Sequence, residues 1–150
     1  MSKMPRKNSN SKLNVLVGEE YLKAIEHEQD IGLDLETSGL SPWHDKIAVV
    51  SIKAPESDTH LIIHTRGKLS PRLKKWLGTR ERLTLHNGAG FDLLLMHEAG
   101  IDVFSPKLYD TMLAELALLT TNRRDVSVNL KSTMYRRTCL LYTSPSPRDA

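Results

Sequence analysis

The sequence contains a single cysteine and no long run of apolar residues. The cysteine is Cys139, near the C-terminus, so the chain before it has no thiol. This excludes disulfide bonds and cysteine-ligated zinc from the body of the protein, and it fits a reducing cytosol. No apolar segment approaches the length of a membrane span or of the core of a signal peptide. We therefore predict a cytoplasmic protein without a membrane partner.

Internal repeats are also absent, and 150 residues are enough for one domain with a modest core. The formal net charge is +3. Residues 1–12 are polar and basic, and we expect them to form a disordered tail. A plain solvated tail is favoured over an arm that contacts nucleic acid.

Two acids lie within an apolar strand pattern. Side chains alternate along a strand, so Leu33 and Leu35 face one side while Asp34 and Glu36 face the other. Two carboxylates roughly 7 Å apart on one strand repel each other. A divalent cation such as Mg²⁺ or Mn²⁺ removes the repulsion, because such ions prefer oxygen ligands. The alternative is an edge strand with two solvated acids, but Ile31 and the lack of a nearby Lys or Arg favour a central strand.

A third acid, Asp92, follows the short apolar strand Leu83–Leu85 and a turn that contains Gly88 and Gly90. It lies in the first turn of an expected helix, where the helix dipole favours an acid. Asp92 could serve only to stabilise that helix. The order of the segments, an acidic pair on one strand and then an acid at the end of a neighbouring strand, favours one shared site.

These segments resemble motifs of the DEDD superfamily of 3′–5′ exonucleases. Asp34-Leu35-Glu36-Thr37 is similar to the first motif, Asp-x-Glu-Thr. Asn87 to Asp92 is similar to the second, Asn-x-x-[Phe/Tyr]-Asp, with one additional residue. Residues 108–114 resemble the start of the next helix in the branch that contains ribonuclease D and the proofreading domains of family A DNA polymerases. The resemblance extends from about Ile31 to Arg136.

The resemblance implies hydrolysis of phosphodiester bonds with two divalent cations, Mg²⁺ or Mn²⁺. It makes three acids both catalytic residues and metal ligands: Asp34, Glu36 and Asp92. It places four further residues at the substrate: Thr37, Leu40, Asn87 and Phe91. Leu40 matches a residue that packs on the terminal nucleotide, although it could equally plug the turn after Gly39. For Phe91 a place in the core is favoured over base stacking.

The third motif of this branch, Tyr-x-x-x-Asp, is absent from the sequence. Residues 139–149 resemble one translated reading frame of a transposase-end adapter used in library sequencing, and we exclude them from the fold. We therefore expect an exonuclease domain at 13–138, a non-native tail at 139–150 and a gene that is cut before its third motif. Such a chain should be nearly inactive.

The pattern of elements predicts an α/β protein. We expect helices at 18–28, 71–77, 91–99 and 111–119, and strands at 31–36, 46–53, 60–64, 83–85 and near Val103. The first three strands should form an antiparallel meander, and the remainder a parallel βαβαβ unit with right-handed crossovers. This is a ribonuclease H-like fold with a mixed five-stranded sheet flanked by helices, incomplete at the C-terminus.

Three functions are compatible with these observations. The first is a 3′–5′ exonuclease that acts on single-stranded 3′ ends, with DNA preferred over RNA and a polymerase domain on the same full-length chain. The second is RNA 3′-end trimming of the ribonuclease D type. The third is a non-catalytic nucleic-acid-binding module, which the presence of all three carboxylates disfavours. A polymerase or an RNA-binding region downstream would separate the first two.

Overall fold

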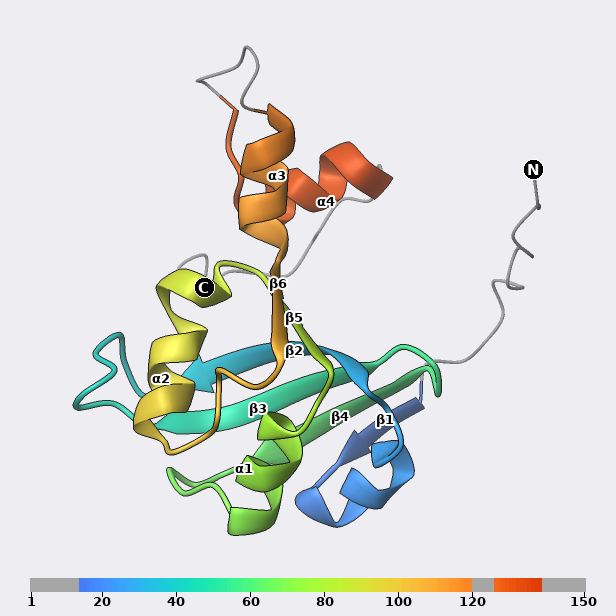
Figure 1. The fold of residues 1–150 in the computed structure, drawn as a ribbon, viewed down its shortest axis with the longest axis vertical. Helices are drawn as coiled ribbons and strands as arrows, with labels where there is room; N and C mark the ends of the chain where they lie inside the picture. Colours follow the sequence, from blue (N-terminus) through green and yellow to red (C-terminus); the bar gives the residue numbers. More distant parts are fainter. Residues whose placement is uncertain (1–13, 120–125, 139–150) are drawn as a thin grey trace, which may run out of the picture.

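A mixed six-stranded sheet forms the centre of the molecule (Figure 1). The structure is a computed structural model that describes residues 14–119 and 126–138. The strand order is β1-β4-β3-β2-β5-β6. The expected tail at 1–12 and the expected non-native segment at 139–150 lie outside the described residues, so both stay predictions.

The antiparallel meander consists of β2 (Asp30–Thr37), β3 (Ile47–Ala54) and β4 (Thr59–His64). The parallel half follows, because β5 (Arg82–Leu85) pairs with β2 and β6 (Lys107–Asp110) pairs with β5. This is the predicted ribonuclease H-like, mixed arrangement. It places β2, the strand that carries the acidic pair, between β3 and β5.

The strand count differs from the prediction. The sixth strand, β1 (Asn14–Val17), pairs in parallel with β4 at the sheet edge. Its short sequence has no alternation strong enough to mark it, and its partner lies more than forty residues further along the chain. The strand expected near Val103 is also wrong. Asp102 accepts hydrogen bonds from the backbone N–H groups of Phe104 and Ser105, which forms a turn there, and β6 begins after Pro106.

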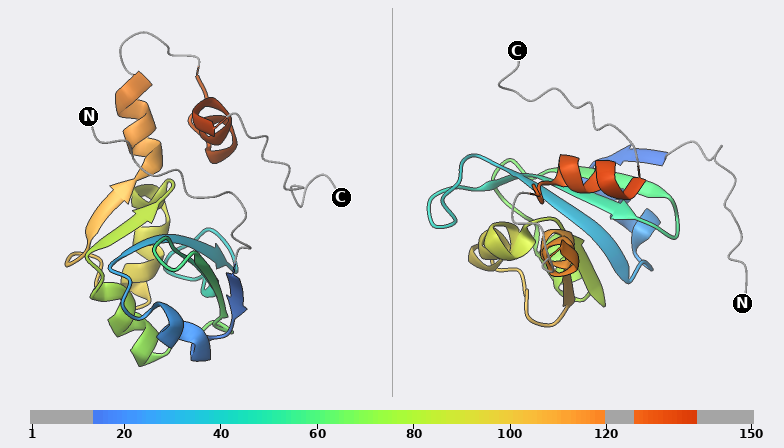
Figure 2. Two further views of the ribbon diagram at one scale, coloured as in Figure 1. Left: turned by 90° about the vertical axis from the view of Figure 1, so that its right-hand side faces the viewer. Right: turned by 90° about the horizontal axis from the view of Figure 1, so that it is seen from above.

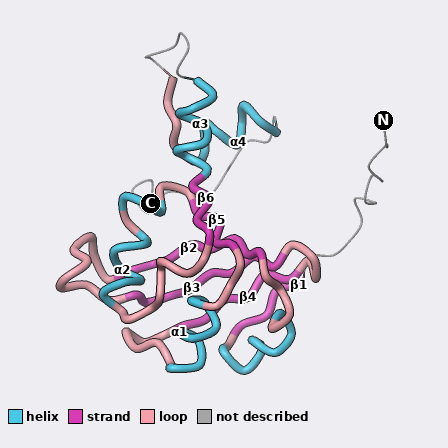
Figure 3. The backbone as a smooth tube through the Cα atoms, viewed as in Figure 1, coloured by secondary structure: helices cyan, strands magenta, loops and turns pink. Residues whose placement is uncertain are grey.

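The helices connect and cover the strands (Figure 3). Between β1 and β2 runs a 3-10 helix, η1 (Glu19–Ile25), in place of the expected longer helix. Helix α1 (Pro71–Gly78) begins at the cap Ser70, whose hydroxyl oxygen accepts from the N–H of Leu73 at 3.0 Å. Helices α2 (Asp92–Glu98) and α3 (Thr111–Leu119) lie close to their predicted ranges, whereas α4 (Leu130–Thr138) was not predicted.

One face of the sheet carries the core. The buried side of β2 packs against apolar side chains of η1, α1 and α2, among them Ile25, Leu73, Leu77 and Met96. The other face of β2 is exposed. Helix α3 extends from the end of β6 away from the sheet, and α4 lies beside it (Figure 2). The buried Glu115 of α3 joins them, since it binds Arg136 at 3.0 Å and Arg137 at 2.8 Å.

Candidate active site

Asp34 and Glu36 lie on the exposed face of a central strand. Along β2, the buried Leu33 and Leu35 alternate with the two exposed acids. The predicted alternation is therefore confirmed. The alternative of an edge strand is wrong, because β3 and β5 flank β2 on its two sides.

Asp92 reaches the same end of the sheet through a tight turn. After β5 the backbone of Asn87 is left-handed, with φ of 61°, and the short 3-10 helix η2 (Gly88–Gly90) follows. A Cβ on Gly88 would lie 2.5 Å from the Cβ of Leu85, so only glycine fits this turn. Asp92 then opens α2 with only 6% of its surface exposed.

The charges of Asp34 and Asp92 act on each other. Burial, followed by the charge of Asp34, raises the pKa of Asp92 from its usual 3.8 to about 6. Burial of its carboxyl also raises the pKa of Asp34, although the side chain as a whole is exposed. The backbone N–H of Leu35 opposes both increases in pKa, since it acts on both carboxylates. The two aspartates, 58 positions apart in the chain, therefore form one electrostatic pair.

Glu36 does not complete a three-carboxylate cluster with this pair. Across residues 14–119 and 126–138, no three His, Cys, Asp or Glu side chains are grouped so that they could hold a metal ion. The convergence of all three acids therefore stays a prediction, supported so far by the electrostatic influence of Asp34 on Asp92. Glu36 is exposed, and within the described part of the chain no hydrogen bond or ion pair fixes its carboxylate.

The four candidate substrate residues lie in two places: Thr37 and Leu40 at the end of β2 and in the loop after it, and Asn87 and Phe91 in the turn before α2. Leu40, in the loop after β2, is 83% exposed, so it does not plug the turn after Gly39. The Thr37 side chain binds the same loop, because its hydroxyl donates to the carbonyl of Gly39 at 2.6 Å. Asn87 is exposed in the turn before α2. Phe91 is partly buried against the core, as the favoured interpretation expected.

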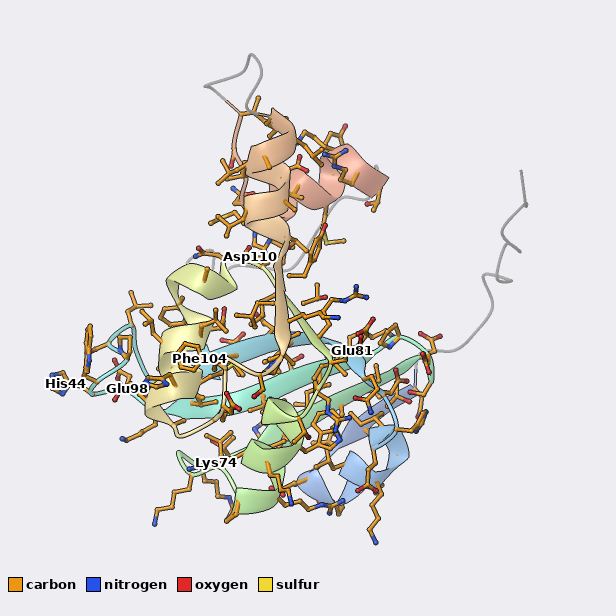
Figure 4. The ribbon with its side chains drawn as sticks, in the orientation of Figure 1. His44, Lys74, Glu81, Glu98, Phe104 and Asp110 are labelled. Atoms are coloured by element: carbon orange, nitrogen blue, oxygen red, sulfur yellow. The ribbon has the colours of Figure 1, made fainter. Side chains whose placement is uncertain are left out.

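Asp110 supports the turn before Asp92, a role that the sequence did not reveal. Its carboxylate accepts from the backbone N–H groups of Asn87 and Ala89, each at 3.0 Å, and from that of Met112 at 2.9 Å. Burial opposes its ionisation, but these hydrogen bonds outweigh burial and lower the pKa of Asp110. Figure 4 shows Asp110 where β6 meets α3. The position of Asp110 before Thr111 indicates a helix cap from the sequence alone. Its hydrogen bonds to the turn join segments that are distant in the sequence, so only the fold reveals them.

His86 contributes a second undetected contact. The Thr111 hydroxyl donates to the carbonyl of Leu85 at 3.1 Å, so it accepts from Nδ1 of His86 at 2.9 Å. Nδ1 of His86 is therefore the donor in this contact. The buried Nε2 has no hydrogen-bond partner among the described residues. Burial raises the pKa of Asp34, and the charge of His86 opposes this increase.

A comparison with known protein families identifies the family of this chain. The sequence model of a family described as 3′-5′ exonuclease matches residues 17–140. The chain belongs to this 3′–5′ exonuclease family. This match confirms the expected membership of the DEDD-type superfamily, to which ribonuclease D also belongs. No curated protein matches the chain.

Several solved structures share the fold of this chain. NrnC of Brucella melitensis bound to pGG has a TM-score of 0.67 and 24% identity, over 90% of this chain and 66% of that one. The same protein with bound Mg²⁺ has a TM-score of 0.63 and 26% identity, over 91% and 64%. Escherichia coli RNase D, an exoribonuclease involved in structured RNA processing, has a TM-score of 0.58 and 17% identity, over 93% and 40%. The chain thus spans about two thirds of the length of NrnC.

Among the helices that the structure describes, we find none with the length and apolar character of a membrane span.

Proposed function

We propose that the chain is the catalytic domain of a metal-dependent 3′–5′ exonuclease that trims single-stranded 3′ ends, with Asp34, Glu36 and Asp92 as catalytic metal ligands. The pairing of Asp34 with the buried Asp92, whose pKa is about 6, carries the proposal. A buried acid held against a second acid is costly to ionise, and a divalent cation between them would offset that cost. Strongly shifted carboxyl pKa values are also typical of active sites.

Two Mg²⁺ or Mn²⁺ ions would supply a water-derived nucleophile and stabilise the charge on the attacking and leaving oxygens. Asp34 and Asp92 would hold one ion, and Glu36 would turn toward Asp34 to hold the other. The exposed position of Glu36 leaves it free to make this movement. Thr37, Leu40, Asn87 and Phe91 are proposed to border the substrate, with Leu40 against the terminal nucleotide.

For the substrate, DNA is the first candidate because of the resemblance to proofreading domains, and a polymerase domain on the same full-length chain remains a prediction. RNA is the second candidate, favoured by the likeness to E. coli RNase D, which is an exoribonuclease. For the location of the protein in the cell, we keep the cytoplasm as the prediction from the sequence.

The test is trimming of 5′-labelled DNA and RNA oligonucleotides of one sequence, with Mg²⁺, Mn²⁺ or a chelator. This chain and the chain extended with its gene's own sequence past Thr138 are compared at high enzyme concentration. We expect metal-dependent shortening from the 3′ end, lost in Asp92→Asn. Asp30→Asn, an exposed acid at the opposite end of β2 that pairs with Arg82, is the matched control. Cleavage of circular substrates as fast as linear ones would show an endonuclease.

A further inference from the structure

A pocket of about 400 Å³ lies beside the end of the acid-bearing strand, on the helical side of the sheet. It is bordered by the loop between β2 and β3, by residues 67–69 before α1, and by the C-terminal half of α2. In Figure 4 the labelled His44 and Glu98 mark two of these sides, the β2–β3 loop and α2. None of the residues assigned above to catalysis or substrate lines this pocket.

Trp43 is held at its rim in an exposed position. The loop around it is tied together by Asp45, which accepts from the Ser38 hydroxyl at 2.9 Å and from the Ser41 N–H at 2.8 Å. Gly39 packs so closely on Asp45 that a Cβ there would lie 2.5 Å from the carboxylate. Trp43 is nevertheless 70% exposed. A large flat side chain that a fixed loop presents to solvent is the feature on which unpaired bases stack.

The charge around Trp43 is suited to phosphate. Lys46, Lys68 and Lys74 line the pocket, and none of them forms an ion pair with a residue in the described ranges. Two acids also line it. The hydrogen bonds that Asp45 accepts lower the pKa of its carboxyl, so Asp45 and Glu98 both oppose a phosphate, and the three lysines outnumber them.

We propose that this pocket, called here the Trp43 pocket, binds an unpaired nucleotide upstream of the 3′ end, with its base on Trp43 and its phosphates on the lysines. The inference rests on the proposed function for the direction of the strand. Glu98 lies about 9 Å along α2 from Asp92, because a helix rises 1.5 Å per residue. Nucleotides in a stacked strand are roughly 3.4 Å apart, so about three nucleotides span the length of α2 between Asp92 and Glu98.

The two tryptophans of the chain provide the test, since Trp43 is exposed and Trp76 is only 6% exposed. Intrinsic fluorescence is titrated with a thymidine octanucleotide and a dinucleotide at low salt in a chelator, which prevents hydrolysis. We expect the octanucleotide to quench Trp43 and to bind more tightly than the dinucleotide. Trp76→Phe should keep the full quenching. Trp43→Ala should weaken binding roughly tenfold, measured by anisotropy of a labelled octanucleotide.

The charge part of the proposal is tested by variants of opposite sign. Lys68→Ala should weaken binding and reduce its salt dependence, and Glu98→Gln should strengthen it. Lys107→Ala, on the far edge strand and paired with Glu81, is the matched control and should change neither. Binding without quenching, equal binding by Trp43→Ala, or no response to Lys68→Ala and Glu98→Gln would overturn the Trp43 pocket.

These outcomes are separable from those of the proposed function. The double variant Asp34→Asn, Asp92→Asn should lose trimming and keep the quenching of Trp43. Trimming by the wild-type chain without any quenching would refute the pocket and leave the exonuclease proposal intact. Quenching without trimming by the extended chain would refute the exonuclease proposal and leave nucleotide binding at Trp43 standing.

Discussion

Replacing Asp92 by Asn should stabilise the fold at neutral pH. Asp92 is 6% exposed, and its pKa of about 6 lies well above its usual 3.8. In the unfolded chain the acid ionises near its usual pKa, so between pH 4 and 6 the folded state binds more protons than the unfolded state. The stability that this group contributes therefore falls as the pH rises through that window. The difference in pKa corresponds to about 3 kcal/mol above pH 6.

Asparagine carries no charge, so the variant escapes this cost. We expect Asp92→Asn to raise the free energy of unfolding at pH 7 by about 1–3 kcal/mol, with the lower values reflecting hydrogen bonds that the amide fails to reproduce. At pH 4 most Asp92 is already protonated in the folded state, and the gain should largely disappear.

The assay is urea unfolding of wild type and variant at several pH values from 4 to 7.5, in a chelator. Only the difference between the two proteins is compared, because other acids titrate over the same range. Asp30→Asn, on the same strand β2 as Asp34, is the control and should not stabilise the fold at pH 7, because it removes the ion pair with Arg82. If Asp92→Asn destabilises the fold equally at all pH values, neither burial nor the charge of Asp34 raises the pKa of Asp92, and the site is misassigned.

Three further predictions concern the metal, the turn and the third motif. At pH 7, Mg²⁺ or Mn²⁺ should raise the melting temperature of wild type but not of the Asp34→Asn, Asp92→Asn double variant, as differential scanning fluorimetry would show; equal shifts would place the metal elsewhere. Asp110→Ala should lower the free energy of unfolding by about 1–2 kcal/mol, because a helix cap and the support of the turn are lost, while Asp110→Asn should recover part of it in urea unfolding. Residues 1–138 contain no Tyr-x-x-x-Asp motif, and they should trim 3′ ends roughly 10²–10⁴ times more slowly than an extended chain in which such a motif is present; equal rates would show that this motif is dispensable.

The sequence alone determined the features that depend on neighbours along the chain. Leu33 and Leu35 alternate with Asp34 and Glu36 because side chains on a strand point to opposite faces, and this placed both acids on one side. The helix predicted at 71–77 agrees with α1, because proline suits the first turn of a helix. The two motifs were recognisable because they are short continuous segments.

Tertiary structure decided what depends on distance through space. Asp34 and Asp92 are 58 positions apart, so only the parallel pairing of β2 with β5 brings them together and raises the pKa of Asp92 to about 6. The same holds for Asp110, whose carboxylate reaches back to a turn more than twenty residues earlier. The edge strand β1 could not be predicted for the same reason, since β2 and β3 separate it along the chain from its partner β4. Glu36 and Leu40 show the limit most clearly, because local pattern fixes their place in the chain, whereas packing around them decides that both side chains are exposed.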